Sequence, residues 1–181
     1  MPDQVVIVPY SPDWPKLFSS LGNALRSALR ETAVRIDHIG STAVPGLDAK
    51  PIIDIQVSVA DLEPLDRYRL PIESVGFVWR ADNPDQTKRY FRETPGQRRT
   101  HIHVRRWGSW AEQAALLFRD YLRTHPLDAR RYAALKHRLA QEYGQDREGY
   151  TQAKSAFVWE ILAKADTWSQ DTGWQPGPTD A

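Results

Sequence analysis

The segment from residue 34 to residue 59 constrains the fold more than any other part of the chain. It holds two β-like apolar runs, 34–39 and 52–59, joined by a loop rich in small residues. Side chains alternate across a strand, so Asp54, Gln56 and Ser58 share one face of the second run, and the isoleucines and valines between them share the other. One face therefore belongs to a hydrophobic core, and the other presents a carboxylate among polar neighbours.

The loop between these strands begins with Gly40, Ser41 and Thr42. Small residues at a strand end let phosphate oxygens approach backbone amides, and the hydroxyl of Ser41 or Thr42 adds a donor. We expect a phosphate-accepting turn here, with a merely tight connection and an ion-paired Asp54 as the alternative. Lys50 precedes a proline and so lies in extended backbone, where it either contacts phosphate or is a solvated lysine.

The remaining pattern predicts one α+β domain. With 181 residues and 41% hydrophobic content, the chain has the size and composition for a single core. The periodicity predicts an α/β core over about 1–108, a helical part over about 109–166 and a tail over 167–181. Within these parts we expect a short strand at 5–8, helices at about 14–30 and 62–75, a meander of strands at 77–80, 88–93 and 100–107, and helices at 110–123, 127–143 and 150–165.

Composition excludes several classes of protein. The chain has no cysteine, which removes disulfide frameworks, thiolate metal sites and cysteine nucleophiles. No apolar run approaches the roughly 20 residues of a membrane-spanning helix, and the first residues lack the layout of a signal peptide. We therefore expect a cytoplasmic protein with no membrane partner.

Positive charge is concentrated between Arg80 and Arg106, a segment that contains eight lysine or arginine residues and only three acidic residues. Such an excess is typical of a surface that meets a nucleotide or another phosphate compound, although a basic, solvated hairpin gives the same pattern. Arg89 lies in this segment on a strand without a clean apolar side, so that strand is exposed or lines a cleft. We include Arg89 among the phosphate-binding candidates; nucleic acid is the less favoured ligand.

His101 and His103 lie two residues apart on a predicted strand, so both imidazoles project from one side. With Asp54 on a neighbouring strand they would complete a site of two histidines and one carboxylate for zinc, manganese or iron. The same pair would also serve as phosphate donors, as an acid/base pair or as hydrogen-bonded structure. Asp37 and His38 point to opposite faces, and the alternation leaves open which of them joins Asp54.

Five segments of the chain resemble the GrpB family: 8–14, 38–55, 100–104, 118–122 and 150–157. The central block, HIGSTAVPGL at 38–47 followed by AKPIIDI at 49–55, is the most specific of them, and THIHV at 100–104 and YTQAKSAF at 150–157 extend the match. The resemblance implies a nucleotidyltransferase-like fold, related to DNA polymerase β and the aminoglycoside nucleotidyltransferases: a mixed sheet with helices on one face and a C-terminal helical part. A similar domain is attached to dephospho-coenzyme A kinase in some actinobacteria.

Nucleotidyltransferases of this kind carry a Gly-Ser turn, an Asp-x-Asp strand and a third carboxylate, which together hold two divalent ions such as magnesium or manganese. Gly40, Ser41 and Asp54 match this pattern, and Asp54 would be the catalytic carboxylate. Gln56 departs from it, because a neutral amide does not replace an anionic ligand. We therefore expect weak or absent nucleotidyl transfer.

Two functions remain open. One is a metal-dependent nucleotidyltransferase that binds a nucleotide over the Gly40 turn; the other is a non-catalytic module that binds a phosphate ligand or a protein. The resemblance places Tyr150 and Lys154, which share a helix face, where related proteins close over the nucleotide. Tryptophan positions predict a core role for Trp14, Trp79 and Trp159, and an exposed surface, suited to self-association or a partner, of Trp107, Trp110, Trp168 and Trp174.

Overall fold

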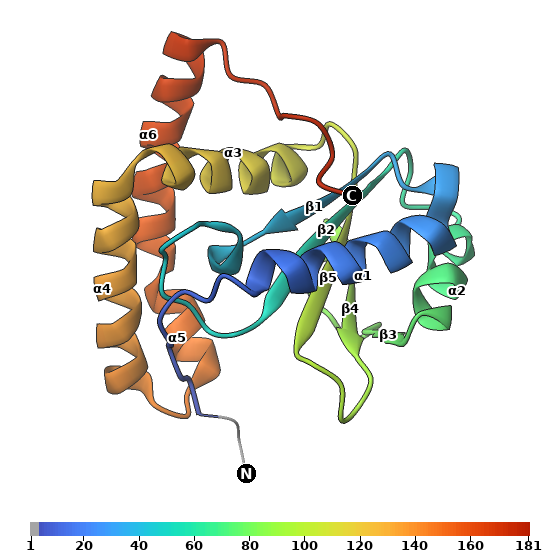
Figure 1. The fold of residues 1–181 in the computed structure, drawn as a ribbon, viewed down its shortest axis with the longest axis horizontal. Helices are drawn as coiled ribbons and strands as arrows, with labels where there is room; N and C mark the ends of the chain where they lie inside the picture. The colour runs from blue at the N-terminus through green and yellow to red at the C-terminus, as the bar shows by residue number, and fades with distance from the viewer. Residues whose placement is uncertain (1–3) are drawn as a thin grey trace.

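The computed structural model describes residues 4–181 and has a five-stranded mixed sheet at its centre (Figure 1). The strands are β1 (Arg35–Ile39), β2 (Ile53–Val59), β3 (Phe77–Trp79), β4 (Lys88–Glu93) and β5 (Thr100–Arg106), in the spatial order β1-β2-β5-β4-β3. Among these five strands of the described chain, only the β2–β5 pair is parallel. The expected meander of three strands is therefore present as β3-β4-β5.

Two helices cover the apolar face of the sheet: α1 (Trp14–Leu29), which crosses in front of the strands in Figure 1, and α2 (Asp66–Ser74). The core between them includes Ile53, Ile55 and Val57 of β2, each fully buried, as the alternation of β2 predicts. Short 3-10 turns at Arg30–Thr32 and Ser41–Ala43 follow α1 and β1. The expected helix over 62–75 is shorter in the structure, where it spans Asp66–Ser74.

The C-terminal part is helical and stands beside the sheet (Figure 1). It consists of α3 (Trp110–Thr124), α4 (Pro126–Tyr143), α5 (Arg147–Ala153) and α6 (Ser155–Thr172). The last helix expected at 150–165 is two helices in the structure, and α6 continues past the expected boundary at 166. None of the helices within residues 4–181 combines the length and the apolar character that crossing a membrane requires.

One expectation about the ends of the chain needs correction, and the structure shows where the tail lies. The predicted strand at 5–8 is reduced to a single bridge between Val8 and Ala49, because Val5 instead donates its amide to Gly144 beyond α4. The tail after α6 runs back to β1 and covers its open edge: Thr179 accepts from the amide of Ile36, and the amides of Asp180 and Ala181 donate to the carbonyl of Ile36. The tail is thus docked on its own domain.

The tryptophans differ from expectation at Trp159, Trp168 and Trp174. Trp14 is buried as predicted, but Trp159 is 57% exposed and stacks on Trp110, which is 65% exposed, with ring centroids 5.6 Å apart. Trp168 is partly buried and packs against the core of the C-terminal helices, and Trp174 donates its indole N–H to Asp120. The exposed aromatic pair is therefore Trp110 with Trp159, at the meeting of α3 and α6.

Candidate functional site

The polar face of the sheet gathers three metal-ligating side chains. The parallel pairing of β2 and β5 sets Asp54 directly beside His101 and Gln56 beside His103. The Oδ1 atom of Asp54 lies 3.2 Å from Nδ1 of His101 and 3.5 Å from Nε2 of His103. The ligand atoms of the three residues all lie within 4.8 Å of one another. The structure thus brings together the three residues that the sequence analysis selected as a metal site.

The two distances from Oδ1 of Asp54, 3.2 and 3.5 Å, are close to those that one shared ion requires. Ligand atoms that lie about 2.05 Å from a tetrahedral zinc ion are roughly 3.3 Å from one another. The remaining nitrogens of the rings, Nε2 of His101 and Nδ1 of His103, are buried and make no hydrogen bond within residues 4–181. These two nitrogens are not the ones that approach Asp54, so each remains available for a water molecule beside the group. Two imidazoles and a carboxylate suit zinc, iron or manganese, whereas magnesium prefers oxygen ligands.

The environment sets the protonation of the group. Burial alone would raise the pKa of Asp54, but hydrogen bonds from His101 and His103 outweigh it and hold that pKa below its usual range. Burial lowers the pKa of His103 to about 4, against the attraction of Asp54 and with help from Arg105 and Lys88. The group therefore combines an ionised carboxylate with a neutral imidazole on His103 at neutral pH.

Gly40 opens the turn beside Asp54, in a backbone conformation that only glycine adopts without strain. Its φ is +72°, and a Cβ atom at this position would lie 2.7 Å from Oδ2 of Asp54. Neither the amide of Ser41 nor that of Thr42 donates a backbone hydrogen bond within the described residues. Both amides thus remain available for an anion, as the sequence analysis expected of this turn.

The side chain of Thr42 does not have the expected role. It is buried, its hydroxyl donates to the carbonyl of Ile52, and the same oxygen lies 3.0 Å from Nε2 of His38. His38 stacks on Phe18 of α1, on the apolar side of the sheet. The hydroxyl of Thr42 therefore holds the loop against β2 and is not directed at a ligand.

Asp37 lies on the same side of the sheet as Asp54, which answers the question that alternation left open. It is fully buried, opposite Gln56, and both of its oxygens accept hydrogen bonds from Arg35, at 2.9 and 2.8 Å. Glu93 is likewise engaged, with Arg92 and the amide of Thr100. Neither acid replaces the carboxylate that Gln56 lacks.

Gln56 itself is part of the packing beneath α3. Its amide group donates to the carbonyl of Glu112, and its oxygen accepts from Arg105, the next residue of the polar face along β5. The carboxylate of Glu112 is buried and accepts from Ser58. A cation therefore contacts Gln56, at the position where the nucleotidyltransferase pattern has its second carboxylate.

Lys154 lines the site, the buried Tyr150 lies next to it beneath Lys154, and Arg89 lies elsewhere. Lys154 lies in the same cleft of about 520 Å³ as Gly40, Asp54 and His103, at the junction of α5 and α6. Burial lowers the pKa of Lys154, while the nearby Asp54 opposes that shift. Lys50 and Lys154 both lie over the ring of the buried Tyr150, at 5.0 and 4.4 Å from its centroid.

Arg89 lies on the other face of the sheet, where its guanidinium pairs with Glu63 at 2.9 Å. Its register opposite Val104 turns it toward the apolar side, so its expected contact with phosphate at this site is wrong. Its neighbour Tyr90 takes the polar face instead and packs against both imidazoles, at centroid distances of 5.5 and 5.3 Å. Sequence alternation separated Arg89 from Tyr90, but only the β4–β5 register shows which of them meets the histidines.

Sequence reasoning also missed Lys136. This lysine of α4 is 2% exposed, donates to the backbone carbonyl of Asp48 and lies 4.6 Å from the centroid of the Tyr132 ring. Burial, with the repulsion of Lys154, lowers its pKa to about 7. A signal was present, because Lys136 follows Ala129 and Tyr132 at helical spacing on the buried stripe of α4.

The family model described as GrpB protein matches residues 4–164. The chain belongs to the GrpB family. The UPF0157 protein PA4798 of Pseudomonas aeruginosa is 43% identical over 90% of this chain and 68% of its own length. A crystal structure of the conserved protein GrpB from Enterococcus faecalis superposes with a TM-score of 0.80 and 35% identity, covering 90% of this chain and 99% of that one.

More distant structures have the nucleotidyltransferase-like fold that the sequence predicted. Cid1 in complex with its short product ApU matches at a TM-score of 0.51 and 18% identity, over 75% of this chain and 43% of that one. Among curated relatives, a dephospho-CoA kinase of Mycolicibacterium paratuberculosis is 33% identical over 95% of this chain but only 48% of its own length. The segment that matches this GrpB chain therefore makes up about half of the length of that kinase.

Proposed function

We propose that this GrpB protein binds a nucleotide or another phosphate compound in the cleft of Asp54, with one divalent ion held by Asp54, His101 and His103. The observation that carries the proposal is the convergence of two histidine nitrogens on one carboxylate oxygen, at 3.2 and 3.5 Å. An ion bound there would withdraw charge from a phosphoryl oxygen.

The residues around this group supply the rest of an anion site. The free amides of Ser41 and Thr42 lie at the turn beside Asp54, and the ammonium group of Lys154 lies across the same cleft. Backbone amides and a lysine are the usual partners of phosphate oxygens in proteins. The chain's own groups would thus bind and orient the phosphate, and Asp54 would remain ionised beside it.

The fold favours metal-dependent nucleotidyl transfer as the activity, and we expect the rate of that transfer to be low in this protein. The pair of ions on which such transfer depends requires several carboxylates, and in this chain Gln56 is neutral and Asp37 is engaged by Arg35. The second candidate function is a non-catalytic module that binds a phosphate compound. The contact between Gln56 and Arg105 favours it, as does the presence of a similar segment within a dephospho-CoA kinase.

Calorimetric titration of metal-stripped protein with zinc, manganese and magnesium tests the metal site. We expect one equivalent of zinc or manganese to bind, with affinity at least tenfold lower in Asp54→Asn and in His103→Gln. His137→Gln is the matched control, because His137 is exposed and its ion pair within residues 4–181 is with Asp48. Two equivalents of magnesium, or unchanged zinc affinity in both site variants, would show that the proposed site is misplaced.

Titration with ATP, CTP, GTP and UTP, with and without the bound ion, then tests the ligand. We expect nucleotide binding that strengthens when the ion is present, and turnover that is slow or absent. Fast nucleotidyl transfer that survives in Asp54→Asn would contradict the proposal, because it would place the chemistry elsewhere. Nucleotide binding without turnover would favour the non-catalytic module.

A further inference from the structure

The exposed aromatic pair of Trp110 and Trp159 lines two neighbouring hollows. One is the cleft of Asp54, of about 520 Å³, and the other is a hollow of about 460 Å³ along the seam of α3 and α6. Ala114 and Leu162 also line both of them. The two hollows therefore adjoin at the pair, and a ligand that extends from one toward the other would pass the two indole rings.

The fold leaves most of the surface of these two indoles uncovered. Trp110 is 65% exposed and Trp159 is 57% exposed, and the two rings stack on each other with an angle of 24° between their planes. Exposed apolar surface beside polar groups commonly marks a binding groove. Aromatic rings favour offset stacking on one another, so the outer surface of the pair suits a flat aromatic ring.

Charge distinguishes the two hollows. Lys154 and Arg105 line the cleft of Asp54, and the guanidinium of Arg105 is held there by the side-chain oxygen of Gln56. The lining of the other hollow, among the described residues, includes one acid, Asp166, and no lysine or arginine. A phosphate group is therefore attracted to the cleft, whereas the second hollow suits an uncharged part of the same ligand.

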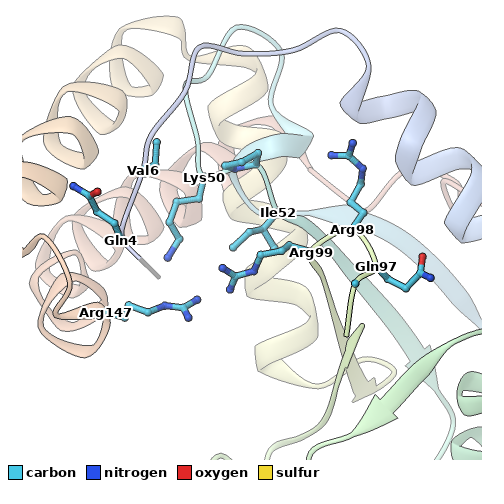
Figure 2. Close-up of a pocket in the computed structure, with 10 residues that line it drawn as sticks. Gln4, Val6, Lys50, Ile52, Gln97, Arg98, Arg99 and Arg147 are labelled. Carbon is cyan, nitrogen blue, oxygen red and sulfur yellow. The ribbon is translucent and has the colours of Figure 1, made fainter. Parts of the chain in front are cut away.

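A cavity elsewhere in the protein lacks such an aromatic wall. It measures about 650 Å³ and lies at the start of β2 and β5, where Figure 2 shows Lys50, Arg98, Arg99 and Arg147 around it. None of the described residues that line it is aromatic. An aromatic phosphate compound is therefore better matched to the cleft of Asp54 than to this cavity.

We propose that the ligand of the cleft is a phosphate ester that carries an aromatic ring, and that Trp110 and Trp159 bind this ring. The phosphate lies near Lys154, and the ring stacks on the pair at the boundary with the second hollow. This inference rests on the function proposed above, because it takes the phosphate to lie in the cleft of Asp54. It names the substrate class: nucleotides and other aromatic phosphate esters, in preference to inorganic phosphates.

Calorimetric titration of the full chain with ATP and with inorganic tripolyphosphate tests the pair. Both ligands carry three phosphate groups, but ATP also carries a ribose and an aromatic base. We expect ATP to bind at least tenfold more tightly than tripolyphosphate to the native protein. In Trp159→Ala this advantage should fall at least fivefold, because a stacked base typically loses that much affinity or more when its aromatic partner is removed.

Two further variants make the comparison specific. Trp159→Phe keeps a flat ring and should retain most of the preference for ATP. Trp107→Ala is the matched control, because Trp107 is also 57% exposed but lines neither hollow. Thermal unfolding checks that each variant is folded.

A second pair of ligands, 1-naphthyl phosphate and inorganic phosphate, repeats the comparison without the ribose. Loss of the preference for the aromatic member of either pair in Trp159→Ala supports the proposal. A loss confined to ATP identifies the ring as a nucleotide base.

Lys154→Gln separates a failure of this inference from a failure of the proposed function. It should weaken ATP and tripolyphosphate alike. If it does, and the preference for ATP is the same in the native protein and in Trp159→Ala, then the cleft binds phosphate but the aromatic pair does not bind the ring, and this inference is overturned. If neither ligand weakens in Lys154→Gln, the phosphate does not lie in the cleft, and the proposed function fails together with this inference.

Sedimentation velocity tests a second copy of the chain as the occupant of the aromatic pair. A dimer that dissociates in Trp159→Ala, with the preference for ATP intact, would assign the pair to self-association and overturn the proposal.

Discussion

A Cβ atom added to Gly40 would lie 2.7 Å from Oδ2 of Asp54. The backbone of Gly40, with a φ of +72°, therefore makes room for the carboxylate that the two histidines share. Gly40, at the start of the loop, and Asp54, on β2, therefore lie against each other, although the whole loop separates them in the sequence.

Gly40→Ala should consequently impair the site as well as the fold. We expect a loss of about 1–2 kcal/mol in the free energy of unfolding from the strained backbone. We also expect at least tenfold weaker zinc binding, because the new methyl group displaces Asp54. Gly46→Ala is a matched control: its φ is +75°, but nothing lies within 4 Å of the added carbon. Equal metal affinity in the two variants would contradict the proposed contact.

Restoring the missing carboxylate alone should not create a two-metal site. In Gln56→Asp the new acid would pair with Arg105, which already contacts Gln56, and the carbonyl of Glu112 would lose its donor. We expect one bound manganese ion, as in the native chain, and no gain in nucleotide turnover. Electron paramagnetic resonance of bound manganese measures this stoichiometry. A second ion in Gln56→Asp, without any change at Arg105, would show that the arginine does not block it.

The sequence could predict most helices and strands, and the face of β2 that carries Asp54, because these depend on the pattern of apolar and polar residues along the chain. Alternation along β2 identified both the buried isoleucines and the face that carries Asp54, and the same alternation put His101 and His103 together. The resemblance to the GrpB family predicted the fold that the comparisons confirm.

What the sequence could not supply is the register between distant strands and the partners of buried charges. Tyr90 and Arg89 are neighbours in a strand of mixed character, and only the pairing of β4 with β5 places Tyr90 on the histidines. Asp37 was a candidate ligand by its position, but Arg35 on the same strand face binds both of its oxygens. The glycine- and proline-rich composition of the tail does not indicate which surface it contacts, so its return to β1 could not be predicted.

The docked tail should contribute to stability through Asp180. Its carboxylate accepts from Arg119 at 2.8 Å and from the amide of His38 at 2.9 Å, and Arg119 is only 3% exposed. In Asp180→Ala the buried guanidinium and amide lose this partner, which should cost about 1–3 kcal/mol in the free energy of unfolding. Urea unfolding measures the loss. Asp171→Ala, at an exposed position of α6, should cost far less, and similar losses in both variants would contradict the role of the tail.

Lys136 should make the stability of the protein depend on pH in a known direction. Its pKa is about 7 in the folded chain, because of burial, and 10.5 is the ordinary value that the unfolded chain would have. Between pH 7 and 10 the unfolded chain therefore binds more protons at this residue, so folding becomes more favourable as pH rises; below pH 7 both states are protonated and this gain is absent.

Lys136→Met removes this titration. Relative to the variant, the native protein should gain up to about 1.4 kcal/mol of unfolding free energy per pH unit between pH 7.5 and pH 9. Urea unfolding at these two pH values measures the gain. Lys16→Met, at a position where the lysine side chain is 79% exposed, should show no comparable change relative to the native protein. Parallel pH profiles for native protein and Lys136→Met would show that Lys136 keeps its charge in the fold, with Asp48 compensating for its burial.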